Sequence, residues 1–256
     1  MTEGAALVRA SDIGLAAITT RRVVVGHSIE GPMVQPAAEP RTGQTRFATN
    51  ARPNRSAALD QYRSRASVYD LELVFARPIR ERAVALLALK PGDIVIDVGC
   101  GTGLSFAMVE EGIGRGGRII AIEQSPEMIK LAAARASRSG WDNISFLRSP
   151  VEEAQIPTRA DGALFHFTHD ILQTRAAVDN VMRGVKSGGR VVSAGLKWAP
   201  RWLPAVNALV RIAAWRSTTT TNGLDKPWRE LERYLRGFEV EQAAGGGIYL
   251  ACGVAR

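Results

Sequence analysis

Hydrophobic positions along the chain follow two periods, which alternate from about residue 93 onward. Short apolar runs rich in Val and Ile predict five buried strands, at residues 93–99, 117–123, 143–148, 161–167 and 188–196. Apolar positions at helical spacing predict helices between them, at 104–112, 125–140 and 174–185, with the first of these ending at Gly112. Two closing strands are predicted within 238–255, around a Gly-rich turn. This alternation is typical of an α/β fold, with a mostly parallel sheet and helices on both faces.

The start of the chain has a different composition. Residues 1–55 are rich in Pro, Ser, Thr, Gly and Arg, and the run at 21–27 is their only regular-looking stretch, so we expect a disordered arm. Met33 leaves open an upstream start codon for the residues before it. A helix pair is predicted within 57–89, and residues 56–256 are long enough for one domain with a sizeable core.

Composition limits the classes of function. Two cysteines are too few for a disulfide framework, and no Cys/His cluster has the spacing of a metal site, so we predict a cytoplasmic protein without a metal. The chain has no apolar run of the roughly 20 residues that span a bilayer. The net charge of +8 and the pI near 10.1 favour anionic surfaces. Nucleic-acid binding is disfavoured, because no recognisable nucleic-acid module accompanies the charge.

A glycine-rich loop follows the first predicted strand and opens a helix. The stretch VIDVGCGTG, residues 95–103, places Gly99, Gly101 and Gly103 there. The dinucleotide pattern G-x-G-x-x-G fails in both registers, and no P-loop Gly-Lys-Ser/Thr follows. The glycines still allow a ligand to approach the backbone closely, and the helix start directs free N–H groups at an anion. A carboxylate fits such a site.

The stretch VIDVGCGTG resembles the first motif of the class I S-adenosylmethionine-dependent methyltransferases at every position. The resemblance covers roughly residues 57–256 and is closest to small bacterial enzymes that act on ubiquinone precursors, phospholipids or small molecules. It implies a Rossmann-like, seven-stranded sheet and S-adenosylmethionine as cofactor. It also implies that the three glycines of the loop line the methionyl part of the cofactor and that Asp97 receives its amino group.

Two further landmarks concern the rest of the cofactor. Glu123 ends the second strand, where its oxygens can accept hydrogen bonds from both ribose hydroxyls. By the family pattern, Gln124 lies against the adenine. Relatives often carry an Asp after the third strand, whereas this chain has Pro150, which leaves the backbone of Val151 to reach the adenine ring.

Candidate catalytic groups lie at the end of the fourth strand. His166 and His169 follow it, beside the expected place of the transferable methyl group. Histidine exchanges protons near neutral pH, so either residue is a candidate general base. The alternative is structural: His166 packs between sheet and helix, and His169 caps the next helix.

Residues 196–236 form an insert before the closing strands. It holds four of the five tryptophans and several arginines. We expect it to shape the acceptor site as a lid for a lipophilic acceptor, and contact with a membrane surface is a further hypothesis. A plain helical cover on the sheet is the alternative. Tyr69, in a segment that resembles the cofactor-covering segment of related enzymes, is a candidate cofactor contact.

These features together predict an S-adenosylmethionine-dependent methyltransferase that acts on a small or lipophilic acceptor. A quinone-like or phenolic ring suits an aromatic pocket with a histidine base, and a phospholipid amine suits a basic, apolar insert. We expect a cytoplasmic protein, and the membrane hypothesis places it at the inner face of the membrane. The alternative function is a non-catalytic, cofactor-binding regulatory protein.

Overall fold

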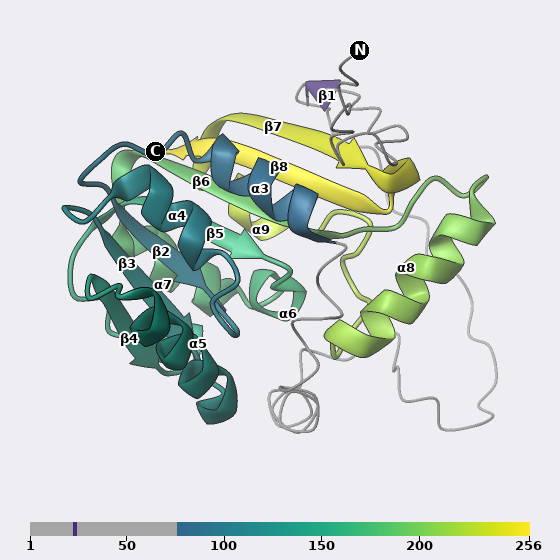
Figure 1. The fold of residues 1–256 in the computed structure, drawn as a ribbon. Helices are drawn as coiled ribbons and strands as arrows, with labels where there is room; N and C mark the ends of the chain where they lie inside the picture. Colours follow the sequence, from purple (N-terminus) through teal and green to yellow (C-terminus); the bar gives the residue numbers. More distant parts are fainter. Residues whose placement is uncertain (1–22, 25–75) are drawn as a thin grey trace, which may run out of the picture.

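The computed structural model describes residues 23–24 and 76–256, and its strands form one sheet in the order β1-β7-β8-β6-β5-β2-β3-β4 (Figure 1). The strands are β1 (Val23–Val24), β2 (Ile94–Val98), β3 (Arg118–Glu123), β4 (Ile144–Arg148), β5 (Ala160–His166), β6 (Val185–Leu196), β7 (Leu235–Ala243) and β8 (Ile248–Ala255). The helices are α3 (Arg77–Leu86), α4 (Phe106–Ile113), α5 (Pro126–Ser139), α6 (His169–Leu172), α7 (Arg175–Gly184), α8 (Pro204–Ser217) and α9 (Arg229–Glu232). Two 3-10 turns are η2 (Val151–Glu153) and η3 (Ala244–Gly246).

The sheet is mixed but mostly parallel. Strands β4, β3, β2, β5 and β6 are neighbours in that order and all parallel, whereas β8 runs antiparallel between β6 and β7. The seven strands expected from the sequence are therefore confirmed. The two residues of β1, from the run at 21–27, pair with β7. The remainder of the N-terminal arm, the first helix of the expected pair and Tyr69 lie outside the described residues.

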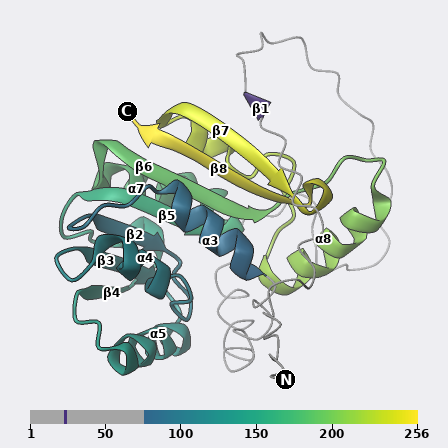
Figure 2. The same cartoon turned by 45° about the horizontal axis from the view of Figure 1, so that its top comes forward.

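Helices cover both faces of the sheet, as predicted (Figure 2). On one face, α3, α4 and α5 bury Ala83, Val109 and Ala132 against the strands. On the other face, α7 and α9 bury Val178 and Leu231. Strands β2, β3 and β5 are thus buried on both sides, which explains why they are continuous apolar runs.

The helix boundaries test the sequence signals for caps. The α5 boundaries are confirmed: the Ser125 hydroxyl accepts from the Met128 N–H at 3.3 Å, and Gly140 ends the helix at φ +67°. The predicted end of α4 at Gly112 is wrong, because that glycine lies inside the helix. A Cβ there would lie 2.9 Å from Leu89 Cβ, so close packing requires this glycine, and Gly114 (φ +62°) ends the helix.

The insert at 196–236 contains α8 and α9. Helix α8 extends beyond the carboxyl end of β6, and its nearest partners are β6 and η3 (Figure 1). From residue 76 onward, every helix is too short or too polar to span a bilayer.

Candidate active site

The glycine-rich loop connects β2 to α4 at the carboxyl edge of the sheet. Its three glycines have φ values of +64° at Gly99, +56° at Gly101 and +77° at Gly103, a region that favours glycine. A Cβ at Gly99 would lie 2.8 Å from Thr168 Cγ2, and one at Gly103 would overlap the Phe106 ring. Both the conformation and the packing of this loop therefore require glycine.

A small cavity lies beside this loop. It has a volume of about 30 Å³ and is bounded by helix α3, strand β2, the loop and the end of strand β5. Its lining residues are Arg80, Asp97, Gly99, Cys100, Gly101, Thr102, Leu104, Ser105, His166 and Phe167. The fold thus brings four of the candidate residues together at one cavity, namely Asp97, Gly99, Gly101 and His166, and Arg80 lines the same cavity.

Two opposite charges are buried at the cavity. Asp97 on β2 is 2% exposed, and its Oδ2 has no hydrogen-bond partner among the described residues. Arg80 on α3 is 4% exposed. Burial raises the pKa of Asp97 to about 7; the positive charge of Arg80 counteracts this shift, and the negative charge of Glu123 adds to it. A buried carboxylate with an unpartnered oxygen favours the binding of a cationic group.

Glu123 ties the loop to the neighbouring strand. Its Oε1 accepts from the Ser125 N–H at 2.8 Å, and its Oε2 accepts from the Gly101 N–H at 3.2 Å. Burial raises the pKa of this carboxyl, and these backbone N–H groups limit the rise. Each carboxylate oxygen has more than one lone-pair site, so both oxygens retain acceptor capacity.

His166 and Phe167 close the cavity at the end of β5. Burial and, to a smaller extent, the positive charge of Arg80 lower the pKa of His166 to about 3, so the imidazole is neutral at pH 7. Its Nε2 has no hydrogen-bond partner among the described residues. Phe167 packs edge-on against it, with 4.8 Å between ring centroids, and has φ +56°. This backbone angle is rare for an aromatic residue and is typical of functional sites.

His169 is in a different environment, at the start of α6. Its Nε2 lies 2.8 Å from the carbonyl oxygen of Asn222, so this nitrogen carries the proton. The neighbouring Asp170 accepts from both the N–H and the hydroxyl of Thr219, at 2.9 and 2.7 Å. Burial lowers the pKa of His169. The hydrogen bonds of His169 and Asp170 hold the segment after α8 against α6. His169 does not line the cavity.

Gln124 and Val151 follow β3 and β4, two adjacent strands, at the same edge of the sheet. Neither lines the small cavity. Val151 is buried, and its carbonyl accepts from the Asn180 side-chain amide at 2.8 Å. Of the described residues 76–256, no three His, Cys, Asp or Glu side chains form a group that could hold a metal ion.

Arg80 is the site residue that the motifs do not indicate. It precedes the loop by about twenty residues and belongs to no pattern of glycines or acids. One signal was available: Arg80, Val84 and Leu87 have the spacing of one helix face, and all three are buried. A charged residue on a buried helix face needs a partner or a ligand.

Known proteins with similar sequences are methyltransferases. Nocamycin O-methyltransferase of Saccharothrix syringae is 35% identical over 81 residues, which are 31% of this chain and 29% of that enzyme. Aklanonic acid methyltransferase DauC of Streptomyces sp. (strain C5) is 32% identical over 96 residues, 37% of this chain and 44% of that enzyme. The chain therefore matches less than half the length of either relative.

The fold is also found among solved methyltransferases. The N-methyltransferase NodS of Bradyrhizobium japonicum WM9, in complex with S-adenosyl-L-homocysteine, has a TM-score of 0.53 at 19% identity, over 70% of this chain and 86% of that one. This likeness shows a shared Rossmann-like fold. The sequence model of the family described as "Methyltransferase domain" matches residues 89–235, more than half of the chain and the part that contains the loop, Glu123 and His166. The chain belongs to this methyltransferase-domain family.

Proposed function

We propose that the protein is an S-adenosylmethionine-dependent methyltransferase that transfers a methyl group to a small or lipophilic acceptor. The observation that carries the proposal is the buried, unpartnered Oδ2 of Asp97 beside a loop that must be glycine at Gly99 and Gly103. Leaving a polar atom unpaired in the interior costs about 1–3 kcal/mol, which a ligand with a matching charge offsets.

The charged groups at the cavity fit the amino-acid end of S-adenosylmethionine. Its ammonium group needs an acidic partner, which Asp97 supplies, and its carboxylate needs a cationic one, which Arg80 supplies. The free acceptor sites of Glu123 suit the ribose hydroxyls, and Gln124 and Val151 stand at the neighbouring strand ends for the adenine. Tyr69 stays a candidate from the sequence. The cavity of about 30 Å³ has room for about one water molecule.

When bound, the cofactor supplies an electrophilic methyl group on a sulfonium. The chain's own task is then to align the acceptor and, where the acceptor carries a proton, to remove it. His166 is the better placed candidate base, because it lines the cavity, is neutral at pH 7 and has an unpartnered Nε2. His169 remains a second candidate through its Nδ1, since its Nε2 is held by Asn222.

An oxygen acceptor is the substrate class that we favour. The nocamycin enzyme and a malonyl-[acyl-carrier protein] enzyme of Serratia marcescens, 28% identical over 107 residues, are both named as O-methyltransferases. The unpartnered Nε2 of His166 lines the cavity, where it can accept the hydroxyl proton of an oxygen acceptor such as a phenol. The aromatic insert at 196–236 suits a ring, a quinone-like one included. A phospholipid amine is the second candidate, because the insert is also basic and apolar.

The test is transfer of labelled methyl from S-adenosylmethionine to a panel of phenols, quinols, small organic acids and phosphatidylethanolamine. Label in the phenol, quinol or acid fraction, lost in Asp97→Asn and strongly reduced in His166→Asn, would support the proposal. Label only in phosphatidylethanolamine would transfer it to the amine. Cofactor binding without any turnover would support the regulatory alternative. A protein that neither binds the cofactor nor transfers label would refute both.

A further inference from the structure

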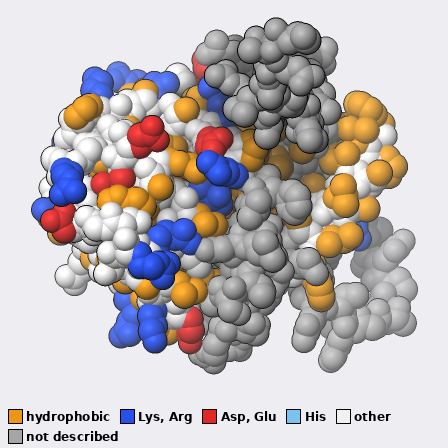
Figure 3. Space-filling view, viewed as in Figure 1, with side chains coloured by type: hydrophobic (Ala, Val, Ile, Leu, Met, Phe, Trp, Pro, Cys, Tyr) orange, Lys and Arg blue, Asp and Glu red, His pale blue; other side chains and the backbone are white. Residues whose placement is uncertain are grey.

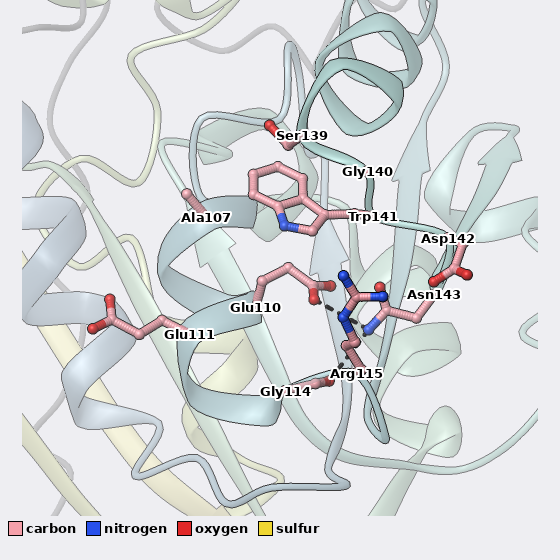
Figure 4. Close-up of a pocket in the computed structure, with 10 residues that line it drawn as sticks. All are labelled: Ala107, Glu110, Glu111, Gly114, Arg115, Ser139, Gly140, Trp141, Asp142 and Asn143. Carbon is pink, nitrogen blue, oxygen red and sulfur yellow. Dashed lines mark hydrogen bonds between the residues drawn. The ribbon is translucent and has the colours of Figure 1, made fainter.

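Exposed apolar side chains gather on one part of the insert. In the described part of the chain, five large hydrophobic residues are exposed, and four of them lie between residues 202 and 215. They are Trp202 (77% exposed), Leu209 (67%), Ile212 (56%) and Trp215 (52%). Figure 3 shows that hydrophobic side chains gather over α8, and exposed apolar patches mark interaction sites on many proteins.

The inner side of α8 packs against the rest of the described protein. Val210 and Ala214 are its buried residues, and Val206 lies close to Gly245 of η3 and to Gly247, the residue after η3. A helix on a protein surface normally turns charged and polar residues outward. The outer side of α8 instead carries Leu209 and Ile212, so packing against the described residues does not explain its composition.

The charge of this segment is of one sign. All charged residues from 196 to 217 are basic, namely Lys197, Arg201, Arg211 and Arg216. The Lys197 ammonium donates to the carbonyls of Trp198 and Gly246 and serves the fold. Arg201 and Arg211 are exposed beside the apolar patch. A second copy of the chain on a two-fold axis would bring like charges together, whereas an anionic surface complements them.

We propose that Trp202 and the outer face of α8 dock on an anionic lipid surface, with the helix lying in the plane of the membrane interface. Apolar and tryptophan side chains enter the acyl boundary while arginines meet the lipid phosphates. A helix of 14 residues is about 21 Å long and does not span a bilayer. The docking does not depend on methyl transfer and can be measured without the cofactor.

The experiment is co-sedimentation of the full chain with phosphatidylcholine vesicles that contain, or lack, phosphatidylglycerol. We expect binding that requires the anionic lipid and weakens with salt. Trp202→Ala should weaken it about tenfold, and Arg201→Gln about fivefold. The matched controls are Leu131→Ala, which removes the fifth exposed hydrophobic residue, on α5, and Arg138→Gln, an exposed arginine on the same helix. Both should bind as the unchanged protein does.

Tryptophan quenching by brominated lipid provides a second readout, because it requires the side chains to enter the bilayer. Thermal melts of each variant check that folding is unchanged. Absence of binding to phosphatidylglycerol vesicles would overturn the proposal. So would losses in the Leu131 and Arg138 variants equal to those in the Trp202 and Arg201 variants. Self-association that Trp202→Ala abolishes, without vesicle binding, would assign the patch to an interface between copies and would also overturn it.

Discussion

The state of the Asp97 carboxyl predicts that cofactor binding depends on pH. Without a ligand, burial holds its pKa at about 7, with Arg80 lowering and Glu123 raising it. The ammonium group of the ligand requires the ionised carboxylate, so protonated molecules must lose a proton before binding. Affinity should therefore rise with pH through this window.

The size of the effect follows from the pKa. At about 7, roughly a tenth of the Asp97 carboxyls are ionised at pH 6.0 and about three quarters at pH 7.5. Binding of S-adenosylhomocysteine, which keeps the amino-acid end, should thus become about eightfold tighter over this range. His166 does not contribute, because its pKa of about 3 lies outside the window.

The assay is titration calorimetry in two buffers of different ionisation enthalpy, which also counts the protons released. Methylthioadenosine, which lacks the amino-acid end, separates Asp97 from Glu123, whose pKa burial also raises. If Asp97 is responsible, methylthioadenosine shows no pH dependence. An eightfold change that persists with methylthioadenosine, or a flat profile with S-adenosylhomocysteine, would refute the reasoning.

Four other outcomes follow from the same geometry. Asp97→Asn should stabilise the ligand-free protein at pH 8 by up to about 4 kcal/mol and leave its stability unchanged at pH 4. The reason is that the protein with Asp97 loses folding stability as pH rises from 3.8, the pKa of the unfolded carboxyl, to about 7, its pKa in the folded state. Denaturant unfolding at both pH values checks this. Arg80→Gln should weaken S-adenosylhomocysteine binding tenfold or more and leave methylthioadenosine binding unchanged, since only the former has a carboxylate; equal losses would remove its assigned role. Glu123→Gln should weaken both ligands by calorimetry, since both carry the ribose, and unchanged affinity would contradict the ribose contact. Gly99→Ala should cost about 1–3 kcal/mol more in chemical denaturation than Gly92→Ala, which has φ +91° but open space around it; equal costs would mean that Thr168 moves aside.

The fold and much of the site could be predicted from local signals. The strand runs, the Ser125 and Gly140 caps and the glycine loop each depend on neighbouring residues, so the sequence displays them directly. The predicted end of α4 at Gly112 was wrong because a glycine near a helix end indicates either a cap or close packing. Only the contact with Leu89 distinguishes the two.

Long-range contacts were not predictable in the same way. Arg80 and Asp97 line the same cavity because α3 packs against β5 and β6, next to β2, a packing relation that no spacing in the sequence encodes. His166 and His169 are three residues apart and looked equivalent as candidate bases. The turn at Phe167 and the hydrogen bond to Asn222 place one ring at the cavity and the other against the segment after α8.

The most direct test of the central claim is calorimetric titration of the purified protein with S-adenosylmethionine and S-adenosylhomocysteine at pH 7.5. The account predicts one site with micromolar affinity for both ligands and loss of binding in Asp97→Asn, which should itself remain folded. Absence of binding to the unchanged, folded protein would contradict it, because the buried, unpartnered Oδ2 of Asp97 would then have no cofactor to explain it.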